Sequence, residues 1–125
     1  MKKKRLPIGE QSFKSIRENK NNLYIDKTKN ILNIIENSGK YLFFSRPRRF
    51  GKSLLISTLK ELYQGNKELF YDTYAEDNWD FEKTNPVLHI SFGSGTVVSL
   101  EYLQNKLESI INNNAFDNNV EINEK

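Results

Sequence analysis

The sequence carries Gly51, Lys52 and Ser53 in a row, a combination of residue types suited to binding phosphate. Glycine has no Cβ atom, so the backbone at Gly51 can approach an anion closely. The ammonium group of Lys52 can add positive charge toward the outer phosphates of a nucleotide, and the Ser53 hydroxyl can ligate a magnesium ion. These residues predict a loop that binds a nucleoside triphosphate together with Mg²⁺, and Ser53 is the predicted metal ligand.

The residues around this triplet follow the phosphate-binding (P-loop, or Walker A) pattern G-x-x-x-x-G-K-[ST], except that Arg46 stands at the first glycine position. The sequence thus holds a variant of the pattern with additional positive charge, which helps to steer an anionic ligand to the loop. The alternative interpretation is a basic turn in front of an ordinary helix. The predicted nucleotide-binding residues are Arg46, Pro47, Arg48, Arg49, Phe50, Gly51, Lys52, Ser53 and Leu54.

The segments on either side are of the kinds that a phosphate-binding loop requires. Residues 41–45 form a continuous apolar run, typical of a strand buried on both faces of a parallel sheet. Residues 52–63 carry leucines at helical spacing and are followed by Gly65, which predicts a helix that stops there. A helix start leaves its first backbone N–H groups free and favours an anion, so this order of elements supports the prediction.

Helix signals also precede the loop. Ser12 can cap a short helical turn, and Asp26 or Thr28 can cap a helix that ends near residue 37. Isoleucines on one face of that second helix predict that it packs against a core.

The C-terminal part of the sequence predicts one more strand and one more helix. Residues 87–92 form a second apolar run, and Ser99 can cap a helix that ends near residue 112. Alternation of strands and helices indicates the α/β class. With only two strands, we predict a partial P-loop NTPase-type three-layer fold with an incomplete parallel sheet.

Composition narrows the possible functions. The 125 residues have a formal net charge of +3, no cysteine and one histidine, which excludes disulfides and thiolate metal sites and argues against zinc. No apolar run approaches the roughly 18 residues of a membrane helix, so the prediction is a cytoplasmic protein with no membrane partner. The predicted organisation is a flexible basic tail at 1–5, a P-loop domain segment at 6–112 and a polar, poorly ordered tail at 113–125.

Several motifs of the sequence occur together in a characteristic order. They are Leu6-Pro7-Ile8-Gly9, Phe13 with Ile16-Arg17, Tyr24-Ile25-Asp26-Lys27-Thr28, and Ser45-Arg46-Pro47-Arg48-Arg49-Phe50-Gly51-Lys52-Ser53-Leu54-Leu55. In this order and spacing they resemble the start of the predicted AAA-ATPase-like family of bacterial proteins. The resemblance is strongest over residues 6–63, and that family also tolerates a non-glycine residue at the first loop position.

The resemblance implies binding of ATP and Mg²⁺ by the loop that ends in Gly51, Lys52 and Ser53. It also implies a later strand that ends in an acidic pair, and a C-terminal domain resembling PD-(D/E)XK nucleases that could contact nucleic acid. No apolar run of this sequence ends in Asp-Glu. We therefore expect the chain to be a truncated N-terminal segment of the family, and hydrolysis would need a carboxylate from outside it.

The roles of several polar and aromatic residues stay open between a binding role and a structural one. Arg48 and Arg49 could contact phosphate, contact nucleic acid or face solvent. Asp26 fits a helix cap better than a catalytic acid, and His89 fits a hydrogen-bonded core residue better than a ligand. Tyr24 or Trp79 could stack on adenine, although packing explains each of them. The glycine-rich segment 93–95 is explained by a turn.

Three functional hypotheses from different classes follow from the sequence. The first is ATP binding by the N-terminal segment of an ATPase. The second is a small basic nucleic-acid-binding module that uses the N-terminal tail and the arginines at 46–49, and the third is an inactive truncated remnant. The preference between ATP and GTP, the oligomeric state and the biological substrate do not follow from the sequence.

Overall fold

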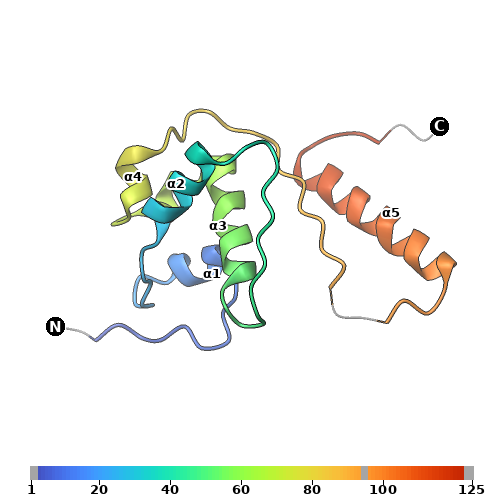
Figure 1. The fold of residues 1–125 in the computed structure, drawn as a ribbon, viewed down its shortest axis with the longest axis horizontal. Helices are drawn as coiled ribbons and strands as arrows, with labels where there is room; N and C mark the ends of the chain where they lie inside the picture. Colours follow the sequence, from blue (N-terminus) through green and yellow to red (C-terminus); the bar gives the residue numbers. More distant parts are fainter. Residues whose placement is uncertain (1–2, 94–95, 123–125) are drawn as a thin grey trace. The chain divides into compact units, whose positions relative to one another are not determined.

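The computed structural model of the chain describes residues 3–93 and 96–122, and these residues are mostly helical (Figure 1). They divide into two compact units, Met1–Asn85 and Pro86–Lys125. The predicted features at residues 1–2, 94–95 and 123–125 lie outside the described residues. The helices are α1 (Phe13–Glu18), α2 (Thr28–Asn37), α3 (Lys52–Gln64), the 3₁₀ helix η1 (Lys67–Phe70), α4 (Tyr74–Asn78) and α5 (Leu100–Asp117).

The predicted α/β fold, a partial P-loop NTPase-type three-layer fold with an incomplete parallel sheet, is wrong for this structure. Within 3–93 and 96–122 there is no β-strand, and backbone pairing outside the helices includes one isolated parallel bridge between Arg5 and Asn22. The two apolar runs that predicted strands, 41–45 and 87–92, have no regular secondary structure. Tyr41 is 94% exposed and Phe43 is 91% exposed, so the first run is not buried on both faces.

The reason lies in what a strand needs from its surroundings. A strand satisfies its backbone N–H and C=O groups through neighbouring strands, whereas a helix satisfies them within its own segment. An apolar run therefore indicates which side chains prefer burial, but it supplies no partner for the backbone. The two runs belong to different compact units, and the described residues pair neither of them with another strand.

The predicted helix boundaries are largely confirmed, because local side chains satisfy the free groups at the helix ends. The Ser12 hydroxyl accepts a hydrogen bond from the Ser15 N–H at the start of α1. At the C-terminal end of α3, Gly65 has φ +77°, a left-handed conformation that glycine adopts without strain and that stops the helix. α5 begins at Leu100, directly after the predicted cap Ser99, and continues to Asp117, beyond the expected end near residue 112.

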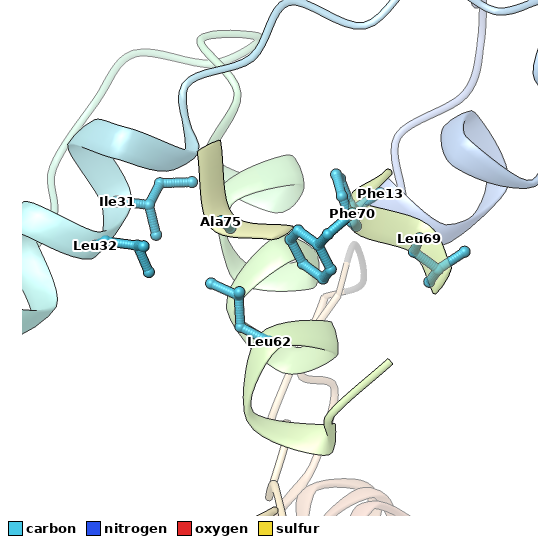
Figure 2. Packing of buried hydrophobic residues seen from close by; sticks show 7 residues of the cluster. All are labelled: Phe13, Ile31, Leu32, Leu62, Leu69, Phe70 and Ala75. Carbon is cyan, nitrogen blue, oxygen red and sulfur yellow. The ribbon is translucent and has the colours of Figure 1, made fainter. Parts of the chain in front are cut away.

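The core of the first unit lies where α1, α2, α3, η1 and α4 meet (Figure 2). The rings of Phe13 and Phe70 pack against each other with centroids 4.6 Å apart, and both side chains are fully buried. Leu62 of α3 is also fully buried beside them. The whole cluster comprises Phe13, Ile31, Leu32, Leu62, Leu69, Phe70 and Ala75.

A buried arginine ties α1 to the segment around η1. The Arg17 side chain is 5% exposed, and its guanidinium donates hydrogen bonds to the carbonyl oxygens of Leu69, at 2.8 Å, and Tyr71. The same guanidinium lies 3.7 Å from the centroid of the Tyr71 ring, a cation–π geometry. Arg17 therefore joins segments more than 50 residues apart in sequence, as the 52-residue separation of its Leu69 contact shows.

In the second unit, asparagine side chains of α5 hold the segment that precedes the helix. The Asn114 side chain accepts from the N–H of His89 at 2.7 Å and donates to its C=O at 3.0 Å. Asn118, one turn later, makes the same pair of bonds to Val87, at 3.3 and 3.1 Å. The prediction of His89 as a core residue is wrong, because its side chain is exposed and only its backbone is held.

No helix in the two described ranges is long and apolar enough to cross a membrane. Arg5, which was assigned to a flexible tail, is held by backbone hydrogen bonds: its N–H donates to Asn21 and its C=O accepts from Leu23, both at 2.7 Å.

Candidate functional site

The candidate site is built where the chain enters α3. Gly51 stands at the N-terminal end of this helix with φ +79° and ψ +17°, in the left-handed region that a residue with a Cβ rarely adopts. Its carbonyl accepts the first helical hydrogen bond, from Leu55 at 2.9 Å. A Cβ added at Gly51 would meet no atom within 4 Å, so the glycine is required by its conformation and the space above it is open.

Left-handed backbone occurs twice in the loop that leads into α3. Arg49 has φ +66°, uncommon for a residue other than glycine, and Gly51 follows two positions later. A left-handed residue next to a helical one turns successive N–H groups toward a common concavity, an arrangement that favours anions. Gly51 followed by Lys52 meets this description, since Lys52 is the first residue of α3.

The first N–H groups of α3 have no partner within the helix. Because Leu55 makes the first helical bond, the N–H groups of Lys52, Ser53 and Leu54 precede the hydrogen-bond ladder. The N-cap residue Gly51 has no side chain that could cap this helix start. The α3 start therefore presents free amide donors and the positive end of the helix dipole to the same place, and both favour an anion.

A hollow of about 540 Å³ opens in front of these groups. One side is formed by Arg49 and residues 51–54, and the other by residues 9–11. Its volume falls in the range of small-molecule sites, about 300–1,000 Å³. The hollow thus brings the predicted lysine, serine and glycine together with a segment from the N-terminal part of the chain.

The remaining predicted loop residues lie elsewhere. Arg46 and Phe50 line a second, larger cavity of about 620 Å³, which Gly51 and Leu54 also border. The Arg46 guanidinium lies 5.7 Å from the centroid of the Phe44 ring. Pro47 and Arg48 are exposed and line neither cavity.

Ser53 is the predicted magnesium ligand, and its position suits that role. It is exposed on the first turn of α3 and borders the hollow next to Lys52. Mg²⁺ commonly takes one or two protein oxygens and completes its shell with phosphate oxygens and water. Residues 3–93 and 96–122 contain no group of three or more His, Cys, Asp or Glu side chains that could hold a metal by themselves. The single Ser53 hydroxyl is compatible with a magnesium ion whose other ligands are phosphate oxygens and water.

Asp26, whose role the sequence left open, joins the starts of two helices. Its carboxylate accepts from the N–H and the hydroxyl of Thr28, at 2.8 and 2.7 Å, and from the N–H of Tyr74 at 2.8 Å. Burial raises the pKa of this carboxyl. The hydrogen bonds from Thr28 and Tyr74 and the charge of Arg17 lower the pKa, and together they outweigh burial, so the net pKa is below its ordinary value. These contacts support the helix-cap interpretation.

Two aromatic residues that could have stacked on adenine have clear packing roles. The Trp79 ring nitrogen donates to the carbonyl of Leu62 at 3.0 Å, and its ring meets that of Tyr63 edge-on with centroids 5.4 Å apart. Tyr24 packs edge-on against Phe13 at 5.3 Å. Burial, followed by the nearby charge of Asp26, raises the pKa of Tyr24 to about 12.

The sequence interpretation missed the second side of the hollow. Residues 9–11 begin with the last residue of the Leu6-Pro7-Ile8-Gly9 motif, which was interpreted only as a turn. Gly9 does have the left-handed backbone of a turn, with φ +81°. The local pattern does not show that this turn lies beside the loop that leads into α3, about 40 residues later. The presence of the motif in the family resemblance was a signal that it matters to the site.

Comparison with known proteins gives a family assignment. The family model described as "Predicted AAA-ATPase" matches residues 7–125. The chain belongs to this family. The match confirms the resemblance inferred from the motifs, and the family's name indicates a relation to ATPases.

One curated protein similar to this chain is described as "Uncharacterized protein in vnfD 5'region" and comes from Azotobacter chroococcum mcd 1. The two sequences are 46% identical over 111 residues, which is 89% of this chain and 21% of that protein. The chain thus spans about a fifth of the length of this curated relative. No solved structure matched the chain.

Proposed function

We propose that the chain binds a nucleoside triphosphate, ATP, through a P-loop-like site at residues 46–54, with Mg²⁺ held by Ser53 and the phosphates. The free amides of Lys52, Ser53 and Leu54 donate to phosphate oxygens, and the Lys52 ammonium adds charge beside them. The observation that carries this proposal is the uncapped α3 start facing a 540 Å³ hollow, in a chain of the predicted AAA-ATPase family.

The loop residues have different parts in this proposal. Arg49 contacts the phosphates from the side of the hollow that it lines, whereas Arg46 and Arg48 raise the local positive potential and steer the ligand. Gly51 keeps the backbone open to the anion because it has no Cβ. Magnesium, when bound, supplies charge that neutralises the β- and γ-phosphate oxygens.

Binding without hydrolysis is the activity proposed for this chain alone. Phosphoryl transfer to water depends on positioning and charge, and in P-loop proteins an acidic residue also holds magnesium. No apolar run of the sequence ends in an acidic pair. The catalytic step would therefore need a carboxylate that no apolar run of this sequence places at its end.

Thermal unfolding with ATP and Mg²⁺ tests the proposal. A ligand that binds only the folded state at about 100 times its Kd stabilises it by roughly 2.7 kcal/mol, enough to raise Tm by several degrees. Lys52→Ala should lose most of that rise. Lys40→Ala, at an exposed lysine of the same unit that lines neither cavity, is the matched control and should keep it. Equal Tm values with and without ATP in the unaltered chain would contradict the proposal.

A further inference from the structure

The hydroxyl of Ser57 connects α3 with the start of α1. Its Oγ accepts a hydrogen bond from the N–H of Phe13 at 2.9 Å and donates to the C=O of Leu54 at 2.9 Å. Phe13 is the first residue of α1, and Ser57 lies one turn after Ser53 on α3. A single hydroxyl thus links the first turn of α3 to the first turn of α1. The two helices are neighbours in the first unit (Figure 1).

This bond satisfies an amide that α1 cannot satisfy itself. The first N–H groups of a helix have no internal partner, and the Ser12 hydroxyl is used by the Ser15 N–H. Ser57 therefore acts as a cap supplied by another helix. Because Phe13 is fully buried in the core, the position of the amide is also held from its side-chain end.

The segment fixed in this way forms one side of the hollow. Residues 9–11 lie just before Ser12, the N-cap residue of α1, and they line the hollow together with Arg49 and residues 51–54. The segment is also held at Glu10, whose carboxylate accepts from the Asn22 side-chain amide at 3.0 Å and pairs with Arg5 at 3.6 Å. The Ser57–Phe13 bond is the side-chain contact that ties the start of α1, just after this segment, to α3.

We infer that Ser57 is a positioning residue for the nucleotide site, an inference that rests on the proposed function. Ser57 does not line the hollow and acts through residues 9–11, which it holds against the α3 start. In this inference the α3 start takes the phosphates, and residues 9–11, which line the same hollow, meet the rest of the ligand, the nucleoside. Loss of the Ser57 hydroxyl should therefore weaken binding of ATP more than binding of a ligand that consists of phosphates alone.

Calorimetric titration of the full chain with ATP and with inorganic triphosphate, both with Mg²⁺, tests this inference. Ser57→Ala should weaken ATP binding about three- to tenfold, the effect of one hydrogen bond, and leave inorganic triphosphate binding unchanged. Ser57→Thr keeps the hydroxyl and should restore ATP affinity. If Ser57→Ala does not fold, Ser57→Cys gives the same comparison with a side chain of similar size and a weak acceptor.

Thr58→Val is the matched control for general damage to α3. The Thr58 hydroxyl donates to the same Leu54 carbonyl at 2.7 Å but makes no bond to α1, so both affinities should stay unchanged. Equal ATP affinity in Ser57→Ala and the unaltered chain overturns the positioning role, as does an equal loss for both ligands. If the unaltered chain binds neither ligand, the proposed function itself fails, and this outcome is distinct from the other two.

Discussion

The Asp26 carboxylate accepts a hydrogen bond from the backbone N–H of Tyr74, 48 residues further along the chain, at 2.8 Å. Its other oxygen holds the N–H and hydroxyl of Thr28, so one side chain stabilises the starts of α2 and α4. The Thr28 hydroxyl in turn accepts from the Ala75 N–H at 3.0 Å. The motif 24–28 therefore fixes two helices to each other, which accounts for Asp26 without a catalytic role.

Asp26→Ala should destabilise the chain by about 0.5–2 kcal/mol, the range for loss of a helix-capping side chain. Asp26→Asn keeps an acceptor oxygen without the charge and should lose less. The pKa of Asp26 is lowered in the folded state, so its contribution is full above the unfolded value of 3.8 and is lost as pH falls through the lower folded pKa. Urea unfolding from pH 7 to 2 measures this. A stability difference between the unaltered chain and Asp26→Asn that does not shrink in acid would count against the assignment.

Tyr24 gives the opposite pH dependence at the alkaline end. Burial raises its pKa from 10.0 to about 12, so the folded state favours the protonated hydroxyl. Its contribution to stability is full below pH 10 and is lost as pH rises from 10 to about 12. Tyr24→Phe cannot ionise and should lose less stability over this interval, as followed by circular dichroism. Identical alkaline unfolding of the two proteins would refute the prediction.

Arg17→Met should be strongly destabilising, by about 2–4 kcal/mol, because the carbonyls of Leu69 and Tyr71 lose a charged donor and the Tyr71 ring loses its cation. Arg17→Lys retains the charge but lacks the planar fork that reaches both carbonyls, so most of the loss should remain. Chemical denaturation measures both values. Arg17→Lys with full stability would show that charge alone suffices.

In the second unit, Asn114→Leu should release the segment around His89, because an alkyl side chain can neither accept from the His89 N–H nor donate to its C=O. Asn112→Leu, at an exposed position of the same helix, is the matched control. Hydrogen exchange at the His89 amide should become faster only in the first variant. Unchanged exchange in Asn114→Leu would contradict the assigned role of this side chain.

The helices were predictable because their signals are local. Ser12, Ser99 and Gly65 act at the ends of their own helices, and the structure has them in those roles. Each satisfies backbone groups within a few residues, so sequence spacing alone was sufficient.

The strands at 41–45 and 87–92 were predicted wrongly because a strand depends on a partner that an apolar run cannot specify. The Arg17 and Ser57 contacts were missed for a related reason. Arg17 reaches Leu69 across 52 residues, and Ser57 reaches Phe13 across 44, distances over which spacing carries no information. For the candidate site, the sequence predicted the residues at the α3 start, whereas the place of residues 9–11 in the lining of the same hollow required the fold.

The most direct test of phosphate binding at the α3 start is to follow the backbone amide resonances of Lys52, Ser53 and Leu54 by NMR during titration with ATP and Mg²⁺. The proposal predicts large shifts at these three amides, also with inorganic triphosphate, and their loss in Lys52→Ala. Resonances that stay unmoved at saturating ATP, or that move only elsewhere in the chain, would contradict it.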